Sequence, residues 1–139
     1  MQLLDKIKKK SFVVFGRAGI DLYADPAGTS AEKTEMFRAD LGGSSANICA
    51  GLSKLGCQSA LVTSVSDDVV GRFCLNRLSH YGVSTQFIKI KDGEHRTSLA
   101  VYESRLDDFQ LCLYRNNAVD FQVNNQDVDD VDYASYGAL

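Results

Sequence analysis

The feature that most constrains the fold is an alternation of apolar runs and helical patterns along the first 90 residues. Residues 11–15 form a continuous β-branched and aromatic run, residues 60–65 form a second, and residues 87–90 form a weaker third. Such runs are typical of strands buried on both faces of a parallel sheet. Because two helical patterns separate the three runs, the order predicts an α/β fold with right-handed crossover connections.

The first expected helix spans about residues 45–55. Ser44 or Ser45 is expected to cap its N-terminus, and Gly56 is expected to follow its last turn in the left-handed conformation. The apolar residues at i, i+4 and i+7, which we expect on the buried face, are Ile48, Leu52 and Leu55. Cys49 is also expected on a buried helix face, as a small hydrophobic residue.

The second expected helix spans about residues 69–81. Asp67 or Asp68 is expected as its N-cap, where a carboxylate also favours the helix dipole, and Gly82 is expected to end it. Its apolar stripe consists of Val70, Phe73, Cys74, Leu78 and Tyr81.

The remaining segments alternate apolar and polar residues with a period of two. This pattern occurs within residues 18–40 and again within residues 96–117, where two runs are joined by a short polar connection. Strands with one wet face do not fit inside a sheet that helices cover on both faces. We therefore expect four strands in a second, small sheet, folded out from the main one as a lid.

The two ends of the chain give separate expectations. Residues 1–10 hold four lysines, and the apolar run that follows them is too short for a signal peptide, so we expect a solvated leader. Residues 137–139 are typical of the start of another core strand. A domain that stopped there would leave a hydrophobic edge unpaired, so we expect a truncated fold from a longer natural protein.

Composition narrows the classes of partner. The chain has 139 residues, 24% of them charged, and a formal net charge of −3. This balance predicts neither a nucleic acid nor a membrane as partner, and no apolar stretch approaches the roughly 20 residues of a membrane span. The four cysteines form no CxxC pair and have no histidine at metal-ligand spacing. We expect reduced thiols, no metal site and a cytoplasmic location.

The segment with the strongest chemical signal is residues 41–47. Gly42 and Gly43 permit a close approach of the backbone to a ligand, and the start of a helix offers unpaired N–H groups. Asn47 can both donate to and accept from a polyol. Taken alone, two glycines before a helix are more often a tight turn. The segment is neither a P-loop nor a dinucleotide-binding fingerprint.

Three segments together carry a more specific signal. They are GRAGID at residues 16–21, GGSSAN at residues 42–47 and VSDDVVG at residues 65–71. In this order and spacing they resemble the N-terminal signatures of the ribokinase-like (PfkB) carbohydrate kinases. The resemblance extends over about residues 11–139. Four longer segments resemble one branch of the family in particular, the branch that phosphorylates a keto sugar acid in inositol breakdown. They are GRAGIDLYADP at residues 16–26, LGGSSANICAGLSKLG at 41–56, VTSVSDDVVGRF at 62–73 and RTSLAVYESR at 96–105.

The resemblance implies a three-layer α/β/α core with parallel strands and a β-sheet lid, and it assigns roles to individual residues. Asp21 would accept hydrogen bonds from sugar hydroxyls, Gly42 and Gly43 would let the sugar approach the backbone, and Asn47 would hydrogen-bond the sugar. Arg115 stands at the lid position from which sugar-acid kinases bind the substrate carboxylate, and a guanidinium fork suits that group. Arg17 and Arg96 flank the expected cleft and are secondary candidates for substrate binding.

The chain departs from the family pattern at three positions. Ser45 and Cys49 stand where small residues are usual, and Ser66 stands where glycine precedes the Asp-Asp pair. Of the three, only Ser45 lies close to the expected sugar site.

The catalytic base and the glycine-rich anion hole of the family belong to its C-terminal half, and no GAGD sequence occurs here. ATP and Mg²⁺ would be bound mainly by that half. We therefore expect no catalytic residue in this chain and no catalysis by it alone.

Three functions stay open at this level. The first is ATP-dependent phosphorylation of a sugar or keto sugar acid by the full-length protein, with this chain supplying the sugar-binding half. The second is a non-catalytic sugar-binding module, and the third is a dimerisation module, with a homodimer formed through the lid. The reading frame beyond codon 139 would discriminate among them.

Overall fold

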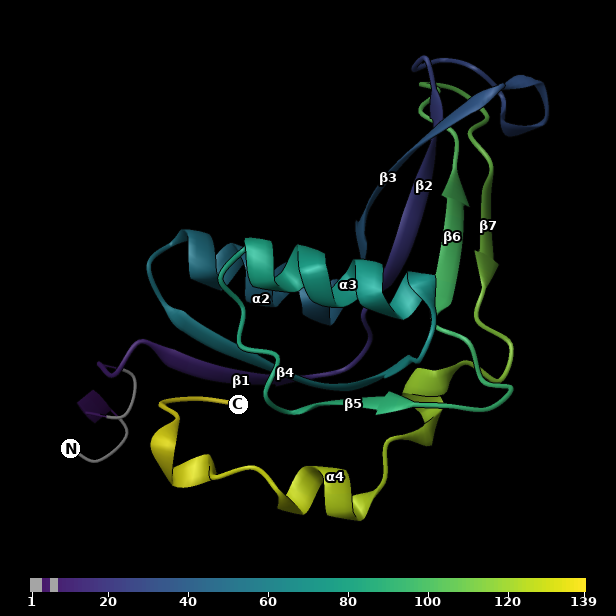
Figure 1. Cartoon of the computed structure of the whole chain (residues 1–139). Coiled ribbons are helices and arrows are strands. Elements are labelled where there is room, and N and C mark those ends of the chain that lie inside the picture. The colour runs from purple at the N-terminus through teal and green to yellow at the C-terminus, as the bar shows by residue number, and fades with distance from the viewer. Residues whose placement is uncertain (1–3, 6–7) are drawn as a thin grey trace.

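The computed structural model describes residues 4–5 and 8–139, so the expected leader lies partly outside the described residues. Two sheets organise the described chain (Figure 1). One is the core sheet, and the other rises from it as the lid. None of the helices in the described part of the chain is long and apolar enough to cross a membrane.

The core sheet contains the three expected strands, all parallel, in the order β1-β4-β5. Their bounds are β1 (Ser11–Phe15), β4 (Gln58–Ser66) and β5 (Ile88–Lys91). Every residue of β4 after Gln58 is buried, as its apolar run predicts for a central strand. The carboxyl ends of the three strands point toward the base of the lid (Figure 1).

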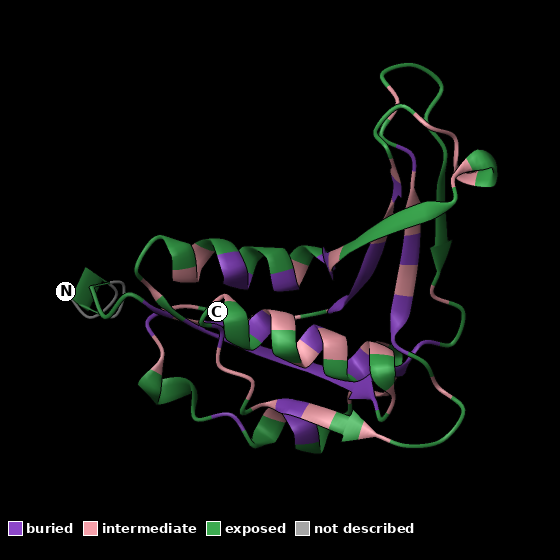
Figure 2. Cartoon of the chain, turned by 45° about the horizontal axis from the view of Figure 1, so that its top comes forward, coloured by how far each residue is buried: buried purple, intermediate pink, exposed green. Residues whose placement is uncertain are grey.

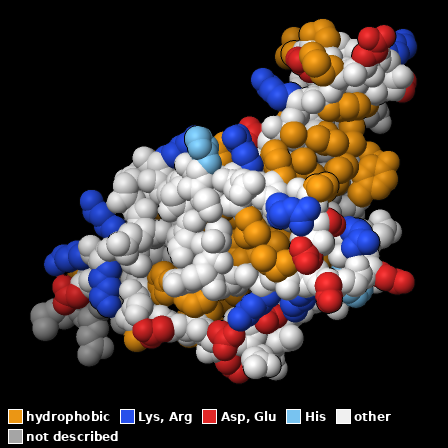
Figure 3. Space-filling model, viewed as in Figure 1, with side chains coloured by type: hydrophobic (Ala, Val, Ile, Leu, Met, Phe, Trp, Pro, Cys, Tyr) orange, Lys and Arg blue, Asp and Glu red, His pale blue; other side chains and the backbone are white. Residues whose placement is uncertain are grey.

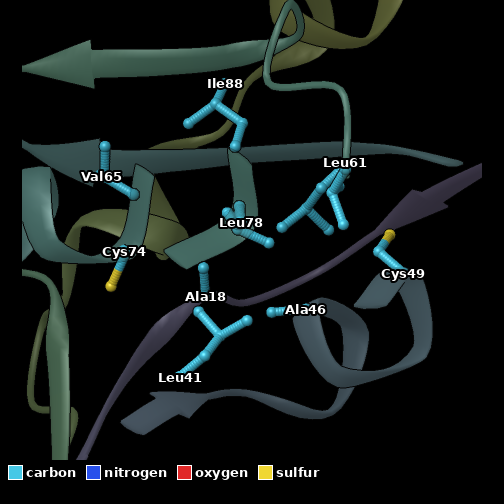
Figure 4. Packing of buried hydrophobic residues seen from close by; sticks show 10 residues of the cluster. Ala18, Leu41, Ala46, Cys49, Leu61, Val65, Cys74, Leu78 and Ile88 are labelled. Atoms are coloured by element: carbon cyan, nitrogen blue, oxygen red, sulfur yellow. The ribbon is translucent and has the colours of Figure 1, made fainter. Parts of the chain in front are cut away.

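Helices α2 (Ser44–Lys54) and α3 (Val69–His80) cover one face of the core sheet (Figure 1). Between them and the sheet lies the main core cluster, which includes Leu61, Cys74 and Leu78 (Figure 4). The opposite face is covered by three short helices, η2 (Val119–Gln122), α4 (Asn125–Asp129) and η3 (Tyr133–Ser135). This is the three-layer α/β/α arrangement that the family resemblance implied.

The buried face of α2 differs from the expected stripe. Ile48 is 52% exposed and Leu55 is 80% exposed, whereas the buried residues are Ala46, Cys49 and Ala50. Small side chains allow the helix to approach the sheet closely, and the Cys49 thiol lies 3.7 Å from the carbonyl oxygen of Ala60. Burial raises the pKa of the Cys49 thiol to about 11. The expectation that larger apolar residues face the core was therefore wrong for this helix.

The expected serine cap of α2 was also wrong. The N-cap is Gly43, at φ +98, and no side chain caps the helix. Instead the Ser45 hydroxyl donates a hydrogen bond to the carbonyl oxygen of Phe15 at 3.0 Å. Ser45 thus fastens the helix start to the end of β1. The φ value of Gly56, +79, confirms the predicted left-handed residue after α2, and Gly82, also at +79, ends α3 as expected.

The cap of α3 is confirmed as Asp68, whose carboxylate accepts from the N–H groups of Val70 and Gly71. Gly71 permits this helix to approach β4 closely, since a Cβ there would lie 1.9 Å from the carbonyl oxygen of Ser66. Ser66 in turn exchanges hydrogen bonds with Thr97, at 2.7–3.0 Å, just before the lid strand that follows. The serine that replaces the usual glycine therefore attaches the lid to the core.

The lid is the predicted second sheet, with strand order β3-β2-β6-β7. Its strands are β2 (Gly19–Asp25), β3 (Met36–Gly42), β6 (Ser98–Tyr102) and β7 (Leu111–Tyr114). Pairs β2–β3 and β6–β7 are antiparallel, while β2 and β6 are parallel. The lid stands clear of the core, and much of β3 and β7 is exposed (Figure 2).

The expected single wet face of β7 was wrong. Leu111 and Leu113 are 51% and 44% exposed, because no described part of the chain covers their side of the sheet. At the chain's end, the expected additional strand begins to form: Ala138 pairs in parallel with Phe12, and the Gly137 N–H donates to Ser11 at 2.7 Å.

Candidate functional site

A row of small residues crosses the base of the lid. The strand register places Gly19 between Gly42 and Ser98. Asp21, two residues further along β2, lies on the same face of the sheet because strand side chains alternate. A Cβ at Gly42 would lie 2.2 Å from Oδ1 of Asp21, so only glycine leaves this carboxylate its place.

The Asp21 carboxylate is buried and half unpaired. The residue is 5% exposed, and Oδ1 has no hydrogen-bond partner in the described part of the chain. Oδ2 faces the Tyr23 hydroxyl at 3.5 Å. Burial raises the pKa of the Asp21 carboxyl, although the nearby Arg17 charge works in the opposite direction. A buried acceptor without a donor is a group that a ligand hydroxyl or amine would satisfy.

Arg17 lies beside this carboxylate and connects β1 to the lid. Its Nη1 donates to the Ser98 hydroxyl at 2.8 Å. The side chain passes over Gly19, where a Cβ would lie 3.1 Å from Nη1. Its carbonyl oxygen accepts from the N–H of Ala46, and a Cβ at Gly43 would approach that oxygen to 2.3 Å. Gly43 therefore allows β1, the lid and α2 to meet here.

Asn47 is exposed on the outer face of α2 and lines a hollow of about 320 Å³. Tyr23, whose hydroxyl approaches Asp21, lines the same hollow. Asp40 is a third polar lining residue, and it also fixes the lid, since its Oδ1 accepts from Arg77 of α3 at 2.8 Å. The structure thus brings Asn47 into a polar hollow that adjoins Asp21.

Arg115 follows β7 on the Asp21 face of the lid, since Leu113 pairs with Ala100 and Ala100 pairs with Asp21. Its guanidinium is already bound within the chain. Nε and Nη2 donate to Oδ2 of Asp120 at 3.1 and 2.6 Å. The guanidinium also lies 4.5 Å from the centre of the Phe121 ring.

Arg96 lies elsewhere. It lines a hollow of about 550 Å³ together with Leu99 and Tyr114. These two residues pair with each other and alternate with Ala100 and Leu113, so they point to the face of the lid opposite Asp21. Arg96 Nη1 donates to the carbonyl oxygen of Gly93 at 2.6 Å. The structure does not bring Arg96 together with Asp21.

Sequence reasoning missed three contributors to this region. Tyr23 shares the face of Asp21 and follows it by two residues, so the strand period could have indicated it. Ser98 and Asp120 gave no comparable signal. Ser98 matters through the register of β2 with β6, and Asp120 through the turn that returns it to Arg115.

Within the described residues, no three His, Cys, Asp or Glu side chains gather as metal ligands. The groups present fit a polyhydroxy ligand better than a nucleotide phosphate. They comprise one unpaired carboxylate oxygen, an exposed amide and a glycine-lined floor.

Comparison with known proteins decides the family. A family model described as pfkB family carbohydrate kinase matches residues 9–138. The chain belongs to this family. The PfkB carbohydrate kinases are phosphotransferases, and the resemblance drawn from the three sequence segments is confirmed.

Curated relatives of this PfkB chain include two enzymes named 5-dehydro-2-deoxygluconokinase. The enzyme from Photobacterium profundum is 34% identical over 117 residues, covering 84% of this chain and 35% of the relative. The enzyme from Geobacillus kaustophilus is 33% identical over 127 residues, covering 91% of this chain and 38% of the relative. The chain therefore spans little more than a third of the length of these relatives.

Solved structures agree on the fold. A fructokinase from Xylella fastidiosa is 26% identical with a TM-score of 0.77, over 92% of this chain and 39% of that one. An uncharacterized sugar kinase from Pyrococcus horikoshii, in complex with ATP, is 26% identical with a TM-score of 0.72, over 86% and 40% of the two chains. Both support the ribokinase-like arrangement of core and lid.

Proposed function

We propose that the protein carrying this PfkB chain transfers a phosphoryl group from ATP to a hydroxyl of a keto sugar acid such as 5-dehydro-2-deoxygluconate, in the cytoplasm and as a step of inositol breakdown. This chain would supply the sugar-binding part. The observation that carries the proposal is the unpaired Oδ1 of Asp21, buried above Gly42. The names of the curated relatives support the choice of a keto sugar acid.

Each site residue has a role that follows from its chemistry. The Asp21 carboxylate would accept hydrogen bonds from one or two sugar hydroxyls, which would replace the water excluded by its burial. Gly42 and Gly43 would let the sugar approach the backbone at the start of α2. Asn47 would bond a further hydroxyl from the adjoining hollow. Arg115, Arg17 and Arg96 are the guanidinium candidates for the substrate carboxylate.

ATP, with Mg²⁺, would supply the transferred phosphoryl group and the neutralising charge around it. The residues of this chain would hold the sugar in place for that transfer. A fixed orientation of the accepting hydroxyl is a substantial part of phosphoryl-transfer catalysis.

The test is a kinase assay on the full-length gene product with ATP, Mg²⁺ and 5-dehydro-2-deoxygluconate. We expect Asp21→Ala to lower kcat/KM about 10- to 150-fold, the loss expected for a hydrogen bond to a charged group. Asp25→Ala, the same change on the same strand but at the lid tip, is the matched control and should stay within about twofold. Substrate binding without turnover in wild type would instead favour the non-catalytic sugar-binding module.

A second part of the proposal is a homodimer through the lid. Apolar side chains gather on the lid surface (Figure 3). Phe37 and Tyr114 are exposed, and their register places them on the face opposite Asp21. A contact there would leave the sugar site open. Sedimentation of the full-length gene product should show a dimer that Tyr114→Asp weakens, while a monomeric wild type would contradict this part.

A further inference from the structure

The three guanidinium candidates for the substrate carboxylate differ in what already binds them. Arg115 donates twice to one oxygen of Asp120, whose side chain is 5% exposed. Its charge is therefore compensated within the chain, and displacing it would leave a buried carboxylate unpaired. Arg96 lines a hollow on the opposite face of the lid, and its Nε lies 3.9 Å from Oδ2 of Asp68.

Arg17 is different. It is half-buried, and its guanidinium contacts a neutral partner, the Ser98 hydroxyl, at 2.8 Å. In the part of the chain that the structure describes, it forms no salt bridge. One of its five N–H donors is used in that contact, so the fork keeps donors free for a carboxylate.

Arg17 also lies in the candidate site, beside the Asp21 carboxylate. The Arg17 side chain passes over Gly19 and reaches Ser98. Gly42, Gly19 and Ser98 form one row across three strands, and the Asp21 carboxylate lies next to Gly42 at the end of that row. The Asp21 carboxylate and the Arg17 guanidinium are thus neighbours without a direct ion pair: the Arg17 charge acts on the Asp21 pKa, yet Oδ1 stays unpaired. An unpaired acceptor and an uncompensated cation side by side match a molecule that carries both hydroxyls and a carboxylate.

We propose that Arg17, rather than Arg115, binds the substrate carboxylate and sets the preference for sugar acids. This inference rests on the proposed function and makes it more specific. Asp21 selects for hydroxyls, Arg17 selects for the acid group, and Ser98 holds the guanidinium in its orientation. Arg115, fixed by Asp120 against Phe121, positions the segment that follows β7.

The experiment compares the keto sugar acid with its primary amide, which has the same shape without the charge. The measured quantity is the ratio of kcat/KM for the acid to kcat/KM for the amide, in the full-length gene product. We expect Arg17→Gln to lower this ratio roughly 10- to 100-fold. Arg115→Gln, the matched control with the same chemical change, should leave the ratio within about threefold of wild type.

Arg17→Lys keeps the charge but loses the planar fork, so its ratio should fall between those of wild type and Arg17→Gln. This variant also decides the matter if Arg17→Gln does not fold, as judged by its circular-dichroism melt. A ratio that is unchanged in the Arg17 variants, or that falls only in Arg115→Gln, would overturn the inference.

Failure of the proposed function would look different, since wild type would then phosphorylate neither compound. Calorimetric titration of the keto sugar acid would still test Arg17. Binding that is lost in Arg17→Gln and kept in Arg115→Gln would support the carboxylate contact. Equal binding by all three proteins, or no binding by wild type, would refute it.

Discussion

At the scale of single residues, the buried and partly unpaired carboxylate of Asp21 lowers the stability of the fold at neutral pH. Burial raises its pKa above the ordinary value of 3.8. The folded state is therefore favoured at low pH, where the carboxyl is protonated in both states, and this contribution is lost as the pH rises through the folded-state pKa. At neutral pH the unpaired buried charge destabilises the fold.

We therefore expect Asp21→Asn to raise the melting temperature of the full-length gene product at pH 7 while it weakens substrate binding. The gain should shrink as the pH falls through the raised folded-state pKa, because a growing fraction of the wild-type carboxyl is then neutral as well. Thermal melts at several pH values, without substrate, measure this. A melting temperature that falls at pH 7 would show that Asp21 has a stabilising partner.

Gly42 permits a second residue-scale prediction. Gly42→Ala would place a Cβ 2.2 Å from the Asp21 carboxylate, so the carboxylate or the strand must shift, and kcat/KM should fall at least tenfold. Gly51→Ala is the control, since a Cβ there meets nothing within 4 Å on an exposed part of α2. That change should stabilise the protein by about 0.5–1 kcal/mol in denaturant titrations. Equal activity of the two variants would contradict the close packing at Gly42.

At the scale of elements, the lid tip depends on Glu103. Its carboxylate accepts from the N–H groups of Ala31 and Gln110 and from Arg105, at 2.6–3.0 Å. The Ala31 hydrogen bond is the largest of several causes that hold the pKa of Glu103 below its ordinary value of 4.5. Stability from this group is therefore present above pH 4.5 and is lost as the pH falls through the lower folded-state pKa.

Glu103→Gln should loosen the lid tip at pH 7, as faster amide hydrogen exchange in residues 26–33 and 103–110. Wild type should show the same loosening only below about pH 4.5. Asp107→Asn, an exposed acidic residue of the same loop, is the control and should leave exchange unchanged. Unchanged exchange in Glu103→Gln would mean that other contacts hold the tip.

At the scale of the whole molecule, the purified 139-residue chain should neither phosphorylate a sugar nor remain monomeric. Its sequence contains no GAGD segment, and among the described residues only Gly137 and Ala138 pair with the outer edge of β1. A largely open strand edge promotes association. Light scattering and an ATP-dependent assay test both expectations, and a monomer with robust turnover would contradict them.

The sequence by itself determined the order of the elements and the family. The core strands could be told from the half-exposed lid strands. A strand buried on both faces is a continuous apolar run, whereas a strand buried on one face alternates apolar and polar residues. The sequence also narrowed the cap of α3 to Asp67 or Asp68 and predicted the glycines that end α2 and α3, since these depend on backbone conformations set within one turn of the chain.

Only the tertiary structure decided which face of α2 is buried and how the arginines are engaged. Ala46 and Cys49 face the sheet, rather than Ile48, because the helix lies too close to the sheet for larger side chains. From the sequence, Arg115 was the first candidate for the substrate carboxylate and Arg17 a secondary one. The register of β2 with β6 gives Arg17 a neutral hydroxyl at Ser98, and a turn after β7 gives Arg115 the carboxylate of Asp120. Such contacts depend on how strands and turns are arranged in space, so the apolar and polar pattern of the sequence does not predict them.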